Sequence, residues 1–209
     1  MDKENENYSD DLKYYKNTIE LYAQNRRNYP FNNKGAEHAR IVLPLIFKYA
    51  NDKIYLLANN LWNSEVVNTN DYISSIQSFL DKGKTQLKII VSSFPYELIE
   101  KDRDSLYKML FHHKAYKDGR VNIKNANGQN LTFKDNEIEL CKITDENGKN
   151  IINFCTADNR MYRIETDILN RKAECNFNDE KTVRRLDRAF DEFWDRLNSD
   201  NVVDLSNVF

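Results

Sequence analysis

The apolar residues in the N-terminal part of the chain follow a helical period. An amphipathic helix is predicted over residues 9–27, with Ser9 as its N-cap. A second helix is predicted over residues 36–50, where Pro44 should kink the helix or mark its true start. The segment between them contains Pro30 and Gly35 and is expected to break the first helix.

The next part of the chain has the pattern of a parallel sheet. Residues 53–58 and 86–91 are continuous apolar runs, which is typical of strands buried on both faces. An amphipathic helix is predicted between them over residues 71–81. Two such strands joined by one helix indicate a right-handed βαβ unit with a parallel strand pair. A further helix is predicted over residues 102–116.

After Gly119 the pattern changes to that of strands and tight turns. The predicted strands cover residues 120–124, 138–143, 150–157, 160–166 and 171–177. Asn147-Gly148 and Asp158-Asn159 are expected to form turns between strands, because these residues tolerate positive φ. The final helix is predicted over residues 179–197, with a wide apolar face and Asn178 as N-cap. We therefore predict a helical N-terminal extension (residues 1–34), one α/β domain (35–198) and a short tail (199–209).

Charge and composition exclude several kinds of protein. The 31 Lys and Arg residues nearly balance the 33 Asp and Glu residues, so any site for a polyanion must be a local patch. The acidic N-terminus lacks the features of a signal peptide, and no apolar stretch approaches the ~18 residues of a membrane span. A cytoplasmic protein without a membrane segment is expected. The three cysteines have no metal-ligand spacing, so we expect no metal and no cofactor, and Cys141 and Cys155 should be small buried hydrophobic residues.

The C-terminal part resembles a known family. Residues 172–197 contain a strand with Glu174, an Asn178-Asp179 turn and a helix that ends in aromatic residues including Trp194. This order is similar to the end of a phospholipase D-like half-domain. Residues 38–61 resemble that family's opening helix and first strand, and residues 71–91 its next helix and strand. The resemblance covers roughly residues 36–197 and implies a phospholipase D-like mixed sheet flanked by helices.

The resemblance also concerns the catalytic motif. Active members carry H-x-K-x4-D, in which histidine attacks phosphorus, lysine binds a phosphate oxygen and aspartate tunes the histidine. If Asp158 occupies the aspartate position, Ile151 and Asn153 stand at the histidine and lysine positions. Isoleucine cannot attack phosphorus, and Asn153 can donate a hydrogen bond but carries no charge. The sequence therefore implies a catalytically degenerate member.

Four residues are candidates for a ligand site that such a scaffold would keep: Asn153, Asp158, Arg163 and Glu174. In this hypothesis Arg163 is an anion clamp and Glu174 holds its guanidinium in place. Ion pairs on a solvated sheet face would explain the same charges. The one catalytic candidate is His38, which could line the end of the sheet or simply belong to a polar helix face.

Three functions are compatible with these patterns. The favoured hypothesis is a binding or regulatory subunit, such as one in a bacterial defence-type system. It would act as a homodimer, because single half-domains of this kind pair to complete a groove, with a protein partner and a nucleic acid or nucleotide as ligand. The alternatives are a phosphodiesterase or nuclease that uses His38, and a structural interaction subunit that docks through residues 9–27 and the apolar tail.

Overall fold

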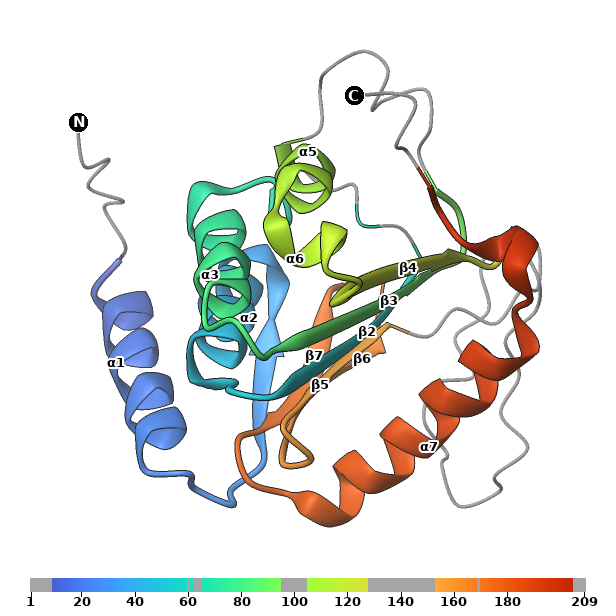
Figure 1. The fold of residues 1–209 in the computed structure, drawn as a ribbon. Helices are drawn as coiled ribbons and strands as arrows, with labels where there is room; N and C mark the ends of the chain where they lie inside the picture. Colours follow the sequence, from blue (N-terminus) through green and yellow to red (C-terminus); the bar gives the residue numbers. More distant parts are fainter. Residues whose placement is uncertain are drawn as a thin grey trace.

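The chain folds around one mixed β-sheet that is covered by helices on both faces (Figure 1). The computed structural model describes residues 9–59, 61, 65–94, 105–127, 153–168 and 170–204. Helix α7 covers one face of the sheet, and the other described helices lie on the opposite side. No helix among these residues is long and apolar enough to cross a bilayer.

The sheet has the strand order β1-β7-β6-β5-β2-β3-β4. Strands β2, β3 and β4 are parallel, whereas β1, β7, β6 and β5 pair antiparallel to their neighbours. The strand bounds are β1 (Phe31–Lys34), β2 (Lys53–Ala58), β3 (Gln86–Val91), β4 (Val121–Asn125), β5 (Phe154–Ala157), β6 (Met161–Asp167) and β7 (Lys172–Asn176).

The helices fall close to the predicted segments. Their bounds are α1 (Asp10–Gln24), α2 (Gly35–Tyr49), α3 (Asn70–Leu80), α5 (Ser105–His112), α6 (Lys114–Lys117) and α7 (Glu180–Arg196), followed by the short 3₁₀ helix η1 (Ser199–Asn201). The parallel pair β2 and β3 joined by α3 is confirmed. Asp158 and Asn159 take the predicted turn, with φ of 53° and 58°. The predictions for residues 138–143, for Asn147-Gly148 and for Cys141 lie outside the described residues.

Two local predictions are wrong, and one of two alternatives for Pro44 is excluded. Helix α2 begins at Gly35 and continues through Pro44, so the proline does not mark its start, and the alternative of a kink stays a prediction. The N-cap of α7 is Asp179, not Asn178, because the Asp179 carboxylate accepts from the backbone N–H of Thr182 at 3.1 Å. The helix predicted up to residue 116 is interrupted at His113, whose side chain caps α6.

The segment before α2 is more than a helix breaker. Residues 31–34 form the edge strand β1 and pair with β7. The division of the chain at residue 34 stays a prediction, but the predicted extension contributes a strand to the sheet.

Apolar side chains form one core on each face of the sheet. Under α7, the aromatic rings of Tyr55 and Phe190 stack with centroids 4.5 Å apart. Asp187 of α7 is tied to the sheet by the hydroxyl of Thr156 at 2.5 Å and the ammonium of Lys53 at 2.9 Å. The larger core, between the sheet and helices α1 to α6, surrounds the candidate site.

Candidate functional site

A cavity of about 380 Å³ lies between the sheet and helices α2 and α3. It opens where β2 ends and β5 begins, because Ala58, Asn59 and Asn153 all line it. Its walls are mostly aliphatic, and its polar residues come from β6, from the start of α3 and from the segments after β2, before β5 and after β6. The lining residues with polar or charged side chains include Asn59, Tyr72, Asn153, Arg163, Glu165 and Arg171.

The polar groups of this cavity form a connected network. The side chain of Asn153 accepts from the backbone N–H of Asn59 at 2.7 Å and donates to the Glu165 carboxylate at 2.7 Å. The other oxygen of that carboxylate accepts from Nη2 of Arg163 at 3.0 Å. Nε of Arg163 donates to Oδ1 of the buried Asn33 at 2.9 Å. Asn153 and Arg163, two of the four candidate ligand-binding residues, are thus brought together.

The prediction that Glu174 holds the guanidinium of Arg163 is wrong. Arg163 and Glu165 are two residues apart on β6, so their side chains share the face toward the cavity. Glu174 pairs in register with Ile164 and points to the opposite face, where it accepts from the hydroxyl of Tyr162 at 2.5 Å. Glu165, not Glu174, therefore holds the guanidinium of Arg163.

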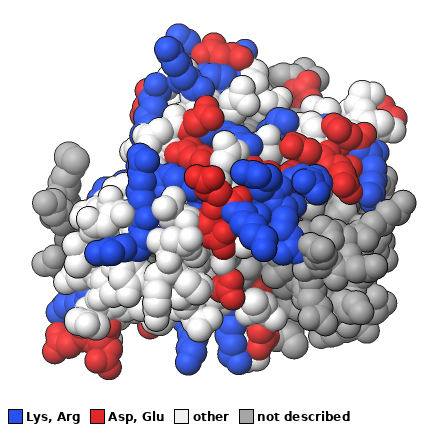
Figure 2. Space-filling model, turned by 90° about the horizontal axis from the view of Figure 1, so that it is seen from below, with Lys and Arg blue, Asp and Glu red and all other residues white. Residues whose placement is uncertain are grey.

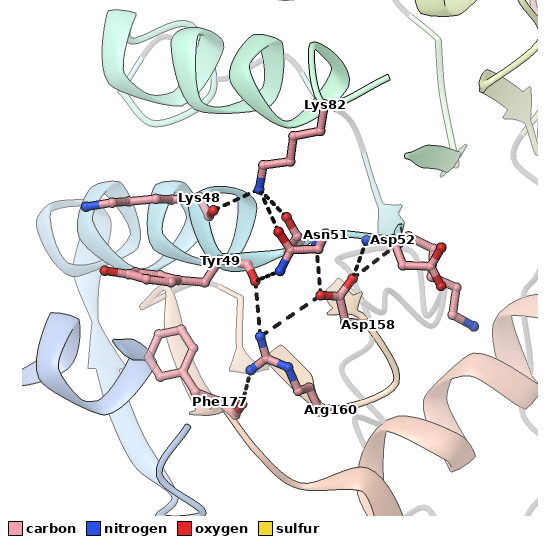
Figure 3. Close-up of polar contacts among 10 residues, drawn as sticks. Lys48, Tyr49, Asn51, Asp52, Lys82, Asp158, Arg160 and Phe177 are labelled. Carbon is pink, nitrogen blue, oxygen red and sulfur yellow. Dashed lines mark hydrogen bonds and ion pairs between the residues drawn. The ribbon is translucent and has the colours of Figure 1, made fainter. Parts of the chain in front are cut away.

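Asp158 lies at the other end of β5 (Figure 3). Its carboxylate accepts from three consecutive backbone amides, those of Asn51 at 2.8 Å, Asp52 at 2.9 Å and Lys53 at 3.2 Å. These amides precede and begin β2, whereas Asn153 is at the strand's carboxyl end. The structure therefore does not bring Asp158 to Asn153, and the carboxylate shapes the connection between α2 and β2.

Two cations complete this connection. The Arg160 guanidinium donates to the carbonyls of Tyr49 at 3.0 Å and Phe177 at 2.8 Å, and the Lys82 ammonium donates to the carbonyls of Lys48 at 3.0 Å and of Ala50 (Figure 3). Burial lowers the pKa of both groups. Because helix C-termini attract cations, this cluster is an end cap for α2.

A wider hollow of about 780 Å³ runs along α7 near Asp158. Its lining mixes four cations with six carboxylates: Lys53, Arg160, Arg184 and Arg188 with Asp158, Glu180, Asp187, Asp191, Glu192 and Asp195. Figure 2, which views the molecule from below, shows blue and red side chains intermingled on this side. The mixture offers no uniform positive surface to a polyanion.

His38 does not line the cavity. Its ring stacks on Tyr15 with centroids 3.8 Å apart, and its Nδ1 accepts from the backbone N–H of Lys34 at 3.3 Å. Burial lowers the pKa of His38 below its ordinary value of 6.5. These contacts favour the non-catalytic interpretation. In it the imidazole packs against Tyr15 and accepts a backbone hydrogen bond near the start of α2.

The lowered pKa of His38 predicts a pH effect on stability. Below about pH 6.5 the unfolded chain binds a proton at this residue more readily than the folded chain does, so the free energy of unfolding falls as the pH falls. We expect His38→Gln to flatten this dependence between about pH 5 and 7. Urea denaturation of the wild type and His38→Gln at several pH values in that range measures the free energy of unfolding. If its slope against pH is equal in the two proteins, His38 is not the titrating group.

The remaining nucleophile candidates in the cavity wall are poorly suited to attack. Cys155 is buried, and burial raises the pKa of its thiol to about 12. Burial also raises the pKa of the Tyr72 phenol well above 10. Within the described ranges no three His, Cys, Asp or Glu side chains are grouped so as to hold a metal ion.

Sequence reasoning missed several contributors to this site, among them Tyr72 and Asn33. Tyr72 and Asn33 lie at the start of α3 and in β1, and neither belongs to the family's motif. A signal existed for Tyr72, because ligands in open α/β sheets bind beyond the carboxyl ends of strands and α3 follows β2. No comparable signal marks Asn33, which reaches Arg163 across 130 residues of sequence.

Solved structures with this arrangement are distant in sequence. The archaeal chromatin protein TrmBL2, which binds DNA, is similar with a TM-score of 0.53 and 14% identity, over 90% of this chain and 62% of TrmBL2. Phosphatidylserine synthase from Haemophilus influenzae has a TM-score of 0.50 and 12% identity, over 83% of this chain and 39% of the synthase. The phospholipase D family member Nuc from Salmonella typhimurium has a TM-score of 0.48 and 14% identity, over 81% of this chain and 97% of Nuc.

No family model matches the sequence, and none of the curated proteins matches it either. The chain spans less than two thirds of TrmBL2, so that likeness concerns one part of the larger protein. At these identities the solved structures bear on the fold alone. With the mixed sheet, its helical layers and the order of its elements, the likeness to TrmBL2 and to the synthase shows that this chain shares their mixed α/β fold.

Proposed function

We propose that this chain is a non-catalytic phospholipase D-like module that binds a ligand in the cavity beside Asn153 and Arg163. The observation that carries the proposal is the polar network of the cavity. Asn153, which the sequence resemblance sets at the family's lysine position if Asp158 is its aspartate, is hydrogen-bonded to Asn59 and Glu165. Glu165 in turn neutralises the charge of Arg163. A cavity of about 380 Å³ is retained around this network, which is within the size range of small-molecule sites.

Hydrolysis of a phosphodiester needs groups that the described lining does not offer. A nucleophile must be activated by a nearby base or a lowered pKa. The pKa values of Cys155 and Tyr72 are raised, and His38 lies outside the lining. The proposal of a phosphodiesterase that uses His38 therefore has no support from the cavity.

The test of this proposal is an assay for hydrolysis. The purified chain is incubated with bis(p-nitrophenyl) phosphate, single- and double-stranded DNA, and RNA, each with and without Mg²⁺ or Mn²⁺, beside an active nuclease of the phospholipase D family. We expect no turnover above buffer, because the described lining lacks an activated nucleophile. Turnover that disappears in His38→Ala or Asn153→Ala would overturn the proposal.

The finer expectations from the sequence remain predictions: a homodimer, a protein partner, a nucleic acid or nucleotide ligand, a cytoplasmic location and a regulatory role in a bacterial defence-type system. The interaction-subunit alternative has one favourable feature, since α1 exposes 75% of Tyr14 and 55% of Leu21. A truncation that tests it should end before β1, because loss of Asn33 would also disturb Arg163.

A further inference from the structure

Two hydrogen-bond donors of the cavity make no hydrogen bond to any described residue. One is the hydroxyl of Tyr72, a residue only 1% exposed. The other is Nη1 of Arg163, whose Nε and Nη2 are engaged by Asn33 and Glu165 and whose side chain is 6% exposed. Both residues line the same cavity, and the charge of Arg163 acts on the Tyr72 phenol.

Both donors are open to the cavity, since neither belongs to the described buried side-chain atoms that lack a hydrogen-bond partner. A ligand in the cavity can therefore accept a hydrogen bond from each of them. The Tyr72 ring is held by an edge contact with Phe47, with centroids 5.1 Å apart. Because burial raises the pKa of Tyr72, its hydroxyl stays protonated and donates at any physiological pH. The two donors therefore suit a ligand that brings acceptor oxygens.

The walls of the cavity define the rest of the ligand. They are mainly aliphatic, and the lining residues of this kind include Leu43, Leu61, Val66, Val67 and Ile168. Burial of an apolar body against such walls contributes about 25 cal/mol per Å² removed from water. A ligand with a polar head and an apolar body matches both parts of the cavity.

The charged residues of the lining, Arg163 and Arg171 against Glu165, favour a polar head with no more than one negative charge. Arg163 is paired with Glu165, and Arg171 is paired with Glu65. A phosphate dianion would have little uncompensated positive charge to pair with. A carboxylate carries one charge and two oxygens, and these correspond in number to the two donors.

We propose that the cavity binds a small carboxylic acid with an apolar body, whose carboxylate accepts from the Tyr72 hydroxyl and from Nη1 of Arg163. The apolar body lies against the aliphatic wall. This inference rests on the proposed function, because it names the ligand class of the same cavity. A phosphodiester also carries one negative charge, so the inferred ligand differs from it in size and in its dependence on Tyr72, and from a phosphomonoester such as AMP also in charge.

The experiment compares probes that share a body and differ in the head group. Hexanoate and phenylacetate are titrated by calorimetry beside hexanamide, hexanol and AMP. We expect the acids to bind about tenfold or more tightly than the matched amide and alcohol, since only the acids carry a negatively charged acceptor. Ala39→Leu, which fills part of the cavity wall, should abolish this binding.

The decisive variant is Tyr72→Phe, which removes only the hydroxyl. It should weaken binding of the acids about tenfold and leave the melting temperature unchanged or raised, because that hydroxyl has no described partner to lose. Tyr49→Phe, which removes a hydroxyl outside the cavity, is the matched control and should bind as the wild type does. Equal binding by Tyr72→Phe, no binding of the acids up to about 10 mM, or preference for AMP would overturn the inference. Those outcomes leave the proposed function standing, since that proposal fails only on turnover.

Discussion

Replacing Asp158 with alanine is expected to lower the free energy of unfolding by about 3–4 kcal/mol. The carboxylate accepts from three consecutive backbone amides, and hydrogen bonds to charged groups contribute about 1.5–3 kcal/mol each when both partners are buried. Asn51 and Asp52 are exposed, so water recovers part of that loss. Asp158 also has a φ of 53°, a conformation that costs a β-carbon residue roughly 1–2 kcal/mol when no local hydrogen bond favours it.

Two further variants separate these contributions. Asp158→Gly keeps the backbone conformation without strain and loses only the carboxylate, so it should be about 1 kcal/mol more stable than Asp158→Ala. Asp158→Asn tolerates the positive φ and keeps one oxygen acceptor, so it should lose about 1–2 kcal/mol. Urea denaturation of the four proteins gives the comparison. If the alanine variant loses less than about 1 kcal/mol, the carboxylate does not hold the connection between α2 and β2.

The central elements were predictable because their sequences have strong patterns. The runs 53–58 and 86–91 are mostly apolar, and they became β2 and β3, most of whose residues are buried. Strand β1 was not predictable by the same means. Its four residues, FNNK, contain one apolar side chain, and they adopt a strand because β7 offers an unpaired edge. The paired residues of β1 and β7 are about 140 positions apart in the sequence, so their pairing leaves no local signal in either segment.

The site was predictable only where a single strand determines it. Arg163 and Glu165 share a face because they are two residues apart on one strand, which the sequence alone determines. The side on which Glu174 points depends on the register of β7 against β6, and a shift of one residue reverses it. The pairing of β6 with β7 contains such a register shift, between Glu165 and Asp167. The position of Asp158 followed from the length of β5, which separates the Asp158 turn from Asn153.

The second large effect is expected at Glu165. Glu165→Ala should lower the free energy of unfolding by about 3 kcal/mol, because it leaves the charge of Arg163 buried without its carboxylate. It also removes the acceptor of the Asn153 amide. Exposure of the Glu165 side chain is only 14%, so solvent screens the pair weakly. Chemical denaturation measures the loss.

The physical cause can be separated from simple loss of packing by a double-mutant cycle. Arg163→Met removes the buried charge and fills similar space, and it should cost less than Glu165→Ala because Glu165 still accepts from Asn153. In Arg163→Met/Glu165→Ala no guanidinium is left uncompensated. The double variant should therefore be more stable than the sum of the single losses by about 1–3 kcal/mol. Additive losses would mean that the two side chains act independently. In that case the charge of Arg163 would be available to a ligand in full, and the preference for a singly charged acid over AMP would lose its electrostatic basis.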